Sequence, residues 1–60
     1  MNKFTVFETI AANGAPMFYA VKGDTVLVSG NGCQSFKPSQ VSPYYVRSNM
    51  AYSHMQKITQ

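Results

Sequence analysis

Hydrophobic and polar positions alternate with period two along the middle of the chain, and this pattern predicts β-strands. The stretch Met17–Gly30 reads as two short strands that fold back on each other at Gly23–Asp24. A two-residue loop with glycine in first place matches the twist of a β-hairpin. Counting outward from the loop places Val21 opposite Val26.

The same register divides the side chains of this hairpin between the two faces of a sheet. One face is apolar and would cover a core, and it carries Met17, Tyr19, Val21, Val26 and Val28. The other face is mixed, and we expect it to be half exposed; it carries Phe18, Ala20, Lys22, Thr25, Leu27 and Ser29.

An earlier stretch, Lys3–Ala11, is rich in aromatic and β-branched residues and predicts a first strand. Its alternation is imperfect, because Glu8 falls on the face of Phe4 and Val6 while Phe7 falls on the opposite face. We therefore expect a β-bulge in this strand, or burial on both of its faces.

Turn chemistry follows the first strand at Asn13–Gly14, with Pro16 just beyond. Asparagine and glycine tolerate positive φ, and proline favours an extended residue before it. The chain therefore begins with a three-stranded antiparallel sheet formed by Lys3–Ala11, Met17–Val21 and Thr25–Ser29.

After the hairpin, Ser29–Gln40 is polar and loop-like, and its glycines belong to turns because no phosphate-loop sequence follows them. Two prolines lie close to Tyr44–Ser48, which favours either an edge strand or a single helical turn there. Apolar residues then recur at helical spacing, which predicts a short amphipathic helix over Asn49–Ile58. We expect this helix to dock on the Val21/Val26 face or on a second copy of the chain.

Part of the hairpin resembles a known family. Lys22–Gly30 (KGDTVLVSG) resembles the start of the KOW motif of ribosomal and transcription-elongation proteins, and more loosely the turn and strand of SH3-like barrels. Ser42–Val46 (SPYYV) is similar to the Pro-x-x-Tyr-Val segment that forms a one-turn helix before the last strand of signalling SH3 domains. The basic residue and second glycine of a KOW loop are missing, and the chain has no tryptophan. The resemblance, centred on Val21–Gly32, implies a small β-barrel that docks RNA or protein.

These elements predict one small domain over residues 1–60. Its fold class is mostly β (α+β), as a small antiparallel sheet or an SH3-like barrel with a short C-terminal helix. A domain this small buries only about 60% of its unfolded-chain surface, so it gains from further support. The apolar stripe of the predicted helix would give a homodimer face, formed by Met50, Met55 and Ile58.

Cysteine and histidine counts limit the available chemistry. Cys33 is the only cysteine and His54 the only histidine, which excludes an internal disulfide and leaves too few ligands for a structural zinc site. A thiol nucleophile would need Cys33 beside His54, with Glu8 to orient the imidazole, and nothing in their spacing brings them together. Acid–base catalysis by paired carboxylates would need Glu8 and Asp24 together, and the position of Asp24 is already explained by its turn. We therefore expect a protein that is not an enzyme, with no cofactor and no metal.

No apolar run reaches the length of a signal peptide or of a membrane span. The sequence therefore predicts a soluble cytoplasmic protein with no membrane partner.

The formal net charge of +3 permits a polyanionic partner. The five basic residues are scattered singly, whereas a nucleic-acid binder neutralises about six to ten phosphates. The residues that would contact RNA or single-stranded DNA are Lys22, Lys37 and Arg47.

Eight aromatic residues and four methionines exceed what one small core can use, so several should be exposed. Exposed aromatic residues beside single basic residues are typical of protein-binding hot spots. The proline-rich segment would supply such a surface through Phe36, Lys37, Tyr44, Tyr45 and Arg47. The sequence therefore favours a small regulator or inhibitor that binds a protein, of the kind phages and mobile elements encode to act on host enzymes. The alternative is a KOW- or SH3-like nucleic-acid-binding protein that stacks bases on its aromatic rings.

Overall fold

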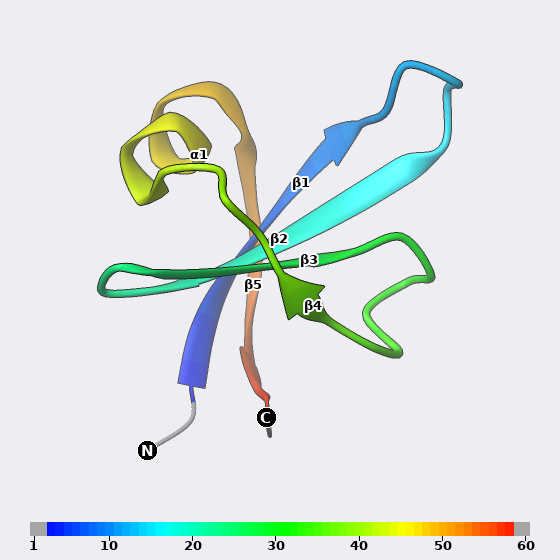
Figure 1. Ribbon diagram of the computed structural model, residues 1–60. Helices are drawn as coiled ribbons and strands as arrows, with labels where there is room; N and C mark the ends of the chain where they lie inside the picture. Colours follow the sequence, from blue (N-terminus) through cyan, green and yellow to red (C-terminus); the bar gives the residue numbers. More distant parts are fainter. Residues whose placement is uncertain (1–2, 59–60) are drawn as a thin grey trace.

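A single antiparallel sheet forms the body of the protein in the computed structural model, which describes residues 3–58 (Figure 1). The elements are β1 (Lys3–Ile10), β2 (Pro16–Lys22), β3 (Thr25–Ser29), β4 (Lys37–Pro38), α1 (Pro43–Asn49) and β5 (Ala51–Lys57). The strands lie in the order β4-β3-β2-β1-β5, so the last strand returns to pair with the first. The predicted fold class, a mostly β antiparallel sheet with one short helix, is confirmed.

The central hairpin forms as predicted. Val21 lies opposite Val26, and Lys22 and Thr25 close the two-residue loop. Gly23 has a φ of 59°, while Asp24 does not have positive φ. This conformation is the one that glycine in first place supplies to a β-hairpin.

Strand β1 is buried on both of its faces, as expected from its imperfect alternation, and the ladder that it forms with β5 is irregular. Its pairing with β5 shifts register between Val6 and Phe7, leaving Ser53 as the extra residue on β5. Val6 and Phe7 are both buried and belong to two different core clusters on opposite faces of the sheet. The burial of both faces is thus confirmed, whereas the extra residue of the bulge lies on β5 and not on β1, which pairs with β2 without a shift.

The mixed face of the hairpin is more buried than its composition predicts. Ala20, Leu27 and Ser29 are all buried. The expectation of a half-exposed face is wrong for these three positions, because later parts of the chain fold back over them. Phe36 and Ile58 pack into the cluster on that side, which we call cluster 1, with Phe4, Val6, Ala20, Leu27, Phe18 and Cys33.

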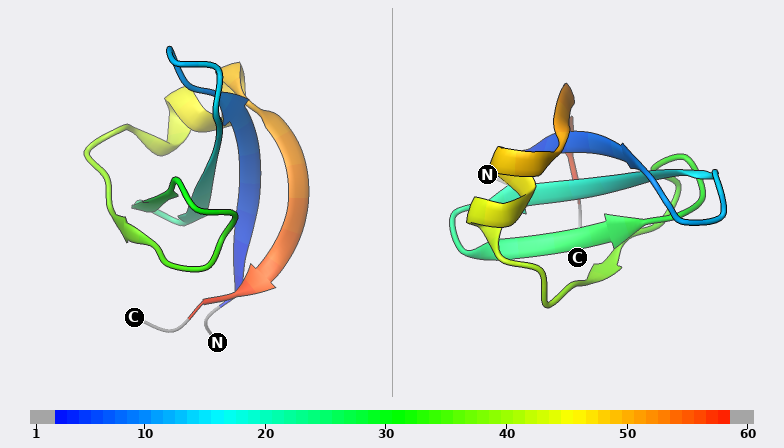
Figure 2. Two further views of the ribbon diagram at one scale, coloured as in Figure 1. Left: turned by 90° about the vertical axis from the view of Figure 1, so that its right-hand side faces the viewer. Right: turned by 90° about the horizontal axis from the view of Figure 1, so that it is seen from above.

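The predicted helix over Asn49–Ile58 is wrong, because Ala51–Lys57 is extended as β5 and pairs antiparallel with β1. Strand β1 has two edges, and β2 covers only one of them. Pairing the other edge satisfies the remaining backbone groups of β1 and the facing groups of β5, which outweighs the helical spacing of a few apolar residues. Figure 2 shows β5 arching along the outside of the sheet.

A helix forms earlier instead, where the sequence left open an edge strand or a helical turn. The Ser42 hydroxyl accepts a hydrogen bond from the Tyr45 backbone N–H at 3.1 Å, and Pro43 occupies the first turn. Both residues are favoured at the start of a helix. Helix α1 precedes the last strand, as the resemblance of Ser42–Val46 to the SH3 segment implies.

Helix α1 docks through Val46, which is completely buried against Val21 and Val26. We call this side cluster 2; it also holds Phe7, with Tyr19, Val41 and Met50 at its margin. A helix therefore covers the expected face, but it is not the predicted one.

The sheet does not close into a barrel within residues 3–58. Strands β4 and β5 are its two edges, and β4 consists of two residues only. In the part of the chain that the structure describes, no helix is long and apolar enough to cross a membrane.

Candidate partner-binding groove

A groove of about 550 Å³ opens beside helix α1, over the cluster 2 face of the sheet. Its origin is the position of α1, which lies at one end of the strands and crosses them (Figure 2). The helix packs on Val21 and Val26 through Val46. The end of this face near the β1–β2 turn therefore stays open, and Ile10, Ala11 and Met17 line the groove there.

The walls of the groove are largely apolar. The sheet contributes Ile10, Met17 and Tyr19, and the helix side contributes Val41, Tyr45 and Met50. Ile10 and Tyr45 are the most exposed of these, at 63% and 52% of their surface. Thr9 and Ser42 add hydroxyl groups to the lining.

This lining suits an apolar ligand or peptide segment that carries one or two polar groups. Methionine is flexible and polarizable, so Met17 and Met50 can adapt to different side-chain shapes. Tyr19 and Tyr45 combine a large apolar ring with a hydroxyl that can form a hydrogen bond. The groove therefore has the chemistry of a peptide- or protein-binding surface.

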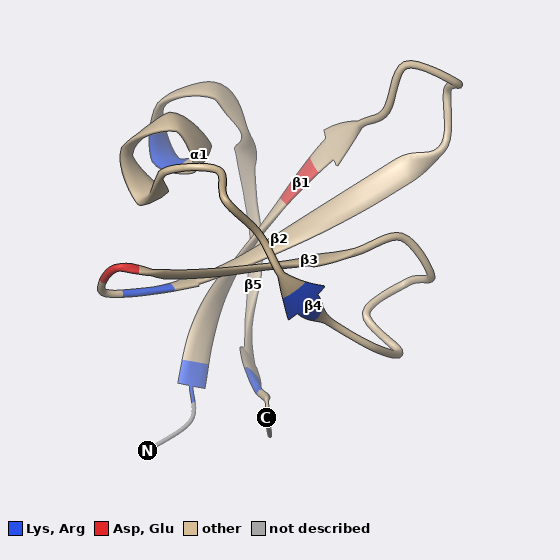
Figure 3. Ribbon diagram, in the orientation of Figure 1, with Lys and Arg blue, Asp and Glu red and all other residues tan. Residues whose placement is uncertain are grey.

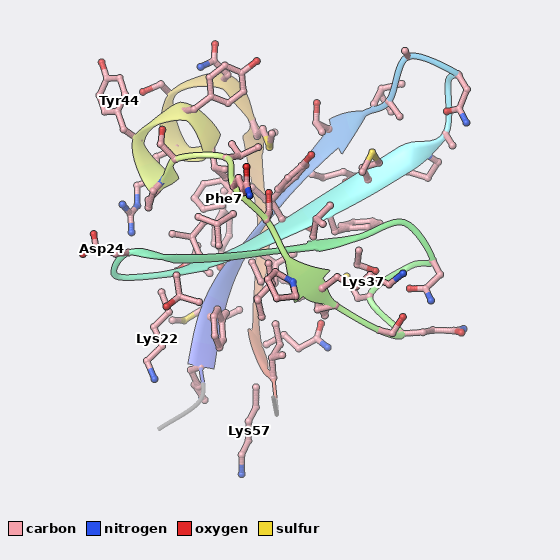
Figure 4. The ribbon with its side chains drawn as sticks, viewed as in Figure 1. Phe7, Lys22, Asp24, Lys37, Tyr44 and Lys57 are labelled. Atoms are coloured by element: carbon pink, nitrogen blue, oxygen red, sulfur yellow. The ribbon has the colours of Figure 1, made fainter. Side chains whose placement is uncertain are left out.

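The predicted hot spot is divided by the fold. Tyr45 lines the groove, whereas its neighbour Tyr44 is 79% exposed and projects away from the helix (Figure 4). Phe36 is half-buried against cluster 1, on the opposite face of the sheet. Lys37 is exposed on β4 and Arg47 is exposed in the last turn of α1. The structure therefore does not bring Phe36 together with the two tyrosines.

The predicted dimer stripe does not exist as a surface. Met50 is half-buried at the margin of cluster 2, Met55 is 57% exposed on β5, and Ile58 is buried in cluster 1. These side chains would share a stripe only in a helix, and the segment is extended.

The sequence analysis missed the sheet wall of the groove. The alternation places Met17 and Tyr19 on the apolar face of the hairpin, but it does not indicate which part of that face a helix leaves uncovered. The sequence held no local signal for this, because the end of the face that a helix covers is set by tertiary packing.

The basic residues are spread over the molecule, with one grouping that the sequence did not predict. Lys22, Lys37 and Arg47 lie on β2, β4 and α1, respectively (Figure 3). Lys3 and Lys57, both exposed, lie directly opposite each other on β1 and β5. Lys22 extends from the same end of the molecule, with its Nζ 5.8 Å from the centre of the Phe4 ring.

The three residues considered for thiol chemistry are not arranged for it. Burial, and secondly the negative charge of Glu8, raise the pKa of the Cys33 thiol, which disfavours the nucleophilic thiolate. The ring nitrogens of His54 lie 2.9 Å from the Ser53 hydroxyl and 3.1 Å from the Gln56 side-chain oxygen. Within residues 3–58, no three His, Cys, Asp or Glu side chains are grouped so as to hold a metal ion.

Comparison with known proteins adds no relative: no family model matches the chain, and no curated protein or solved structure matches it significantly.

Proposed function

We propose that this protein is a small non-enzymatic regulator or inhibitor that binds an apolar segment of a partner protein in the groove beside α1. The observation that carries the proposal is the groove itself, where Tyr45, Ile10 and two methionines line an open apolar surface instead of completing a core. A sheet face that stays open beside a docked helix is where a small domain can accept a partner's side chains.

The net charge of the chain, and not the uncharged lining of the groove itself, favours acidic residues in the partner. Helix α1 has no acidic residue in its first turn and carries Arg47 in its last turn. The chain as a whole has a formal net charge of +3. We therefore propose a partner segment with one or two large apolar side chains flanked by Asp or Glu.

The proposed place of action is the cytoplasm. Cys33 is a free thiol, and unpaired cysteines are typical of reducing compartments.

Helix α1 offers a matched pair of variants for the test. Tyr45 and Tyr44 are neighbours of the same type, but only Tyr45 lines the groove. With a partner identified by affinity capture and then purified, Tyr45→Ala should weaken binding by about 2 kcal/mol or more, as expected for a hot-spot aromatic residue. Tyr44→Ala should change the affinity little, and both variants should keep the wild-type circular dichroism spectrum. Equal effects of the two substitutions would contradict the groove as the binding site.

The second candidate function is nucleic-acid binding, and the Lys3/Lys57 pair is the observation that favours it. Like charges placed directly opposite across two strands destabilise a sheet, and a bound polyanion would relieve this repulsion. In that case removing either lysine should reduce the magnitude of the salt dependence of oligonucleotide binding by about one. Nuclease treatment of the captured complex separates the two functions, because a protein partner survives it.

A further inference from the structure

Two Asn-Gly pairs lie in exposed loops, Asn13–Gly14 in the β1–β2 turn and Asn31–Gly32 in the β3–β4 loop. The asparagine of an Asn-Gly pair can lose its side-chain amide spontaneously. The reaction is an intramolecular attack by the backbone nitrogen of the glycine, which has no side chain to shield this nitrogen. That nitrogen attacks the asparagine side-chain carbon Cγ, forming a new C–N bond, and the amide nitrogen leaves as ammonia with the glycine proton. Water then opens the cyclic imide to aspartate or isoaspartate, and no oxidant or reductant takes part.

The structure holds the two side chains very differently. Asn13 makes one side-chain hydrogen bond, in which its Oδ1 accepts the Ala15 N–H at 3.0 Å. Among the described residues its side-chain nitrogen, the leaving group, has no hydrogen-bond partner. The attacking Gly14 N–H donates to the Ala11 carbonyl at 2.9 Å, and a Cβ built on Gly14 would meet nothing within 4 Å. These bonds lie within one five-residue exposed turn, which can open locally.

Asn31 is held by a network that is anchored in the core. Its Oδ1 accepts from the Ser29 hydroxyl at 2.8 Å and from the Ser35 backbone N–H at 3.1 Å. Its Nδ2 donates to the Ser35 hydroxyl at 2.8 Å, so the leaving nitrogen is itself bound. Ser29 is buried and also accepts the Cys33 N–H at 3.1 Å. Rotation of the Asn31 side chain into the reactive position would break several of these bonds at once.

We propose that Asn13 is a site of spontaneous deamidation in the folded protein, and that the Ser29–Asn31–Ser35 network protects Asn31. The reaction lowers the formal net charge of +3 by one and places a carboxylate two residues from Ala11, which lines the groove. If the groove binds a segment flanked by acidic residues, which rests on the proposed function, deamidation of Asn13 weakens that binding, because the new carboxylate repels those acidic residues. The modification itself is independent of any partner.

The test is incubation of the purified full chain at physiological temperature and mildly alkaline pH, followed by proteolysis and mass spectrometry of the two Asn-Gly peptides. Each net hydrogen bond slows the reaction by about two- to tenfold. The Asn31 side chain makes two more hydrogen bonds than the Asn13 side chain, so Asn13 should be converted at least about fivefold faster. In concentrated urea the two rates should become similar, because the network is lost with the fold. Ser35→Ala should raise the rate at Asn31 by roughly two- to tenfold and leave the rate at Asn13 unchanged.

Equal rates at both sites in the folded wild-type protein would overturn the proposal. So would a folded protein that resists conversion at Asn13 while the unfolded chain reacts there. Both of these results come from the wild-type chain, so they do not depend on how well Ser35→Ala folds. Asn13→Ser serves as the control that removes the site.

Discussion

Phe7 and Tyr52 face each other across β1 and β5, with their ring centroids 6.3 Å apart and their planes at 86°. The contact lies at the shift of register in this ladder, beside the extra residue Ser53. Phe7 is buried in cluster 2, whereas Tyr52 on the edge strand is largely exposed. The edge-to-face contact therefore ties the edge strand to the core at the point where the ladder is interrupted.

Tyr52→Ala should destabilise the fold by about 1 kcal/mol, the magnitude expected for an aromatic pair beyond its area of burial. Tyr52→Phe keeps the ring and should be nearly neutral. Urea denaturation measures both effects as a shift of the midpoint at constant slope. A neutral Tyr52→Ala variant would show that the ring contact does not hold β5 in place.

The hairpin loop gives a second prediction. Gly23 has a φ of 59°, and a Cβ built there meets nothing within 4 Å, so substitution is opposed by backbone conformation alone. Gly23→Ala should therefore cost about 1 kcal/mol of unfolding free energy. Gly30 is a matched control, because it has equal space and no positive φ. Gly30→Ala should be neutral or stabilise the protein by up to about 1 kcal/mol, since alanine restricts the unfolded chain. Equal losses for both variants would contradict this explanation.

The contrast between the hairpin and the last strand shows which parts of the fold were predictable. The Val21/Val26 register depends on a two-residue loop and on alternation within a dozen residues, and both are legible in the sequence. The state of Asn49–Ile58 depends on the free edge of β1, more than forty residues earlier, which no local pattern reports. Helical spacing of three apolar residues was a weaker determinant than a whole ladder of backbone hydrogen bonds.

The candidate groove was partly predictable for the same reason. An excess of aromatic residues indicated an exposed apolar surface, and Tyr45 belongs to it. Which of the neighbours Tyr44 and Tyr45 faces the groove depends on the rotation of α1, and Val46 sets this rotation by docking on the sheet. Phe36 was separated from the tyrosines because the β3–β4 loop returns to cluster 1. These are consequences of tertiary packing.

The thiol of Cys33 gives a prediction for pH. Burial, and secondly the Glu8 charge, raise its pKa above the ordinary value of 9.0, so the folded state holds the proton more tightly than the unfolded state. The stability from this difference is present below pH 9.0 and is lost as the pH rises through the folded-state pKa. Alkylation by iodoacetamide at pH 8 should accordingly be slower in the folded protein than in urea. Glu8→Gln should speed the folded-state reaction, and an equal rate in both states would contradict the assigned environment.

The last prediction concerns the cap of α1, because this hydrogen bond stabilises the start of the helix that forms a wall of the groove. The Ser42 hydroxyl accepts the Tyr45 N–H at 3.1 Å, and no acidic residue in the first turn supports the helix instead. Ser42→Ala should cost about 1 kcal/mol of stability, and Ser42→Asp should retain the cap and add a favourable interaction with the helix dipole.

Because α1 has only seven residues, the lost cap should also loosen Tyr45. Ser42→Ala should therefore weaken partner binding in the same direction as Tyr45→Ala, whereas Tyr52→Ala, with a similar loss of stability, should leave binding unchanged. Calorimetry on the three variants separates these effects, and equal losses of binding for Ser42→Ala and Tyr52→Ala would show that stability, and not the position of α1, controls the groove.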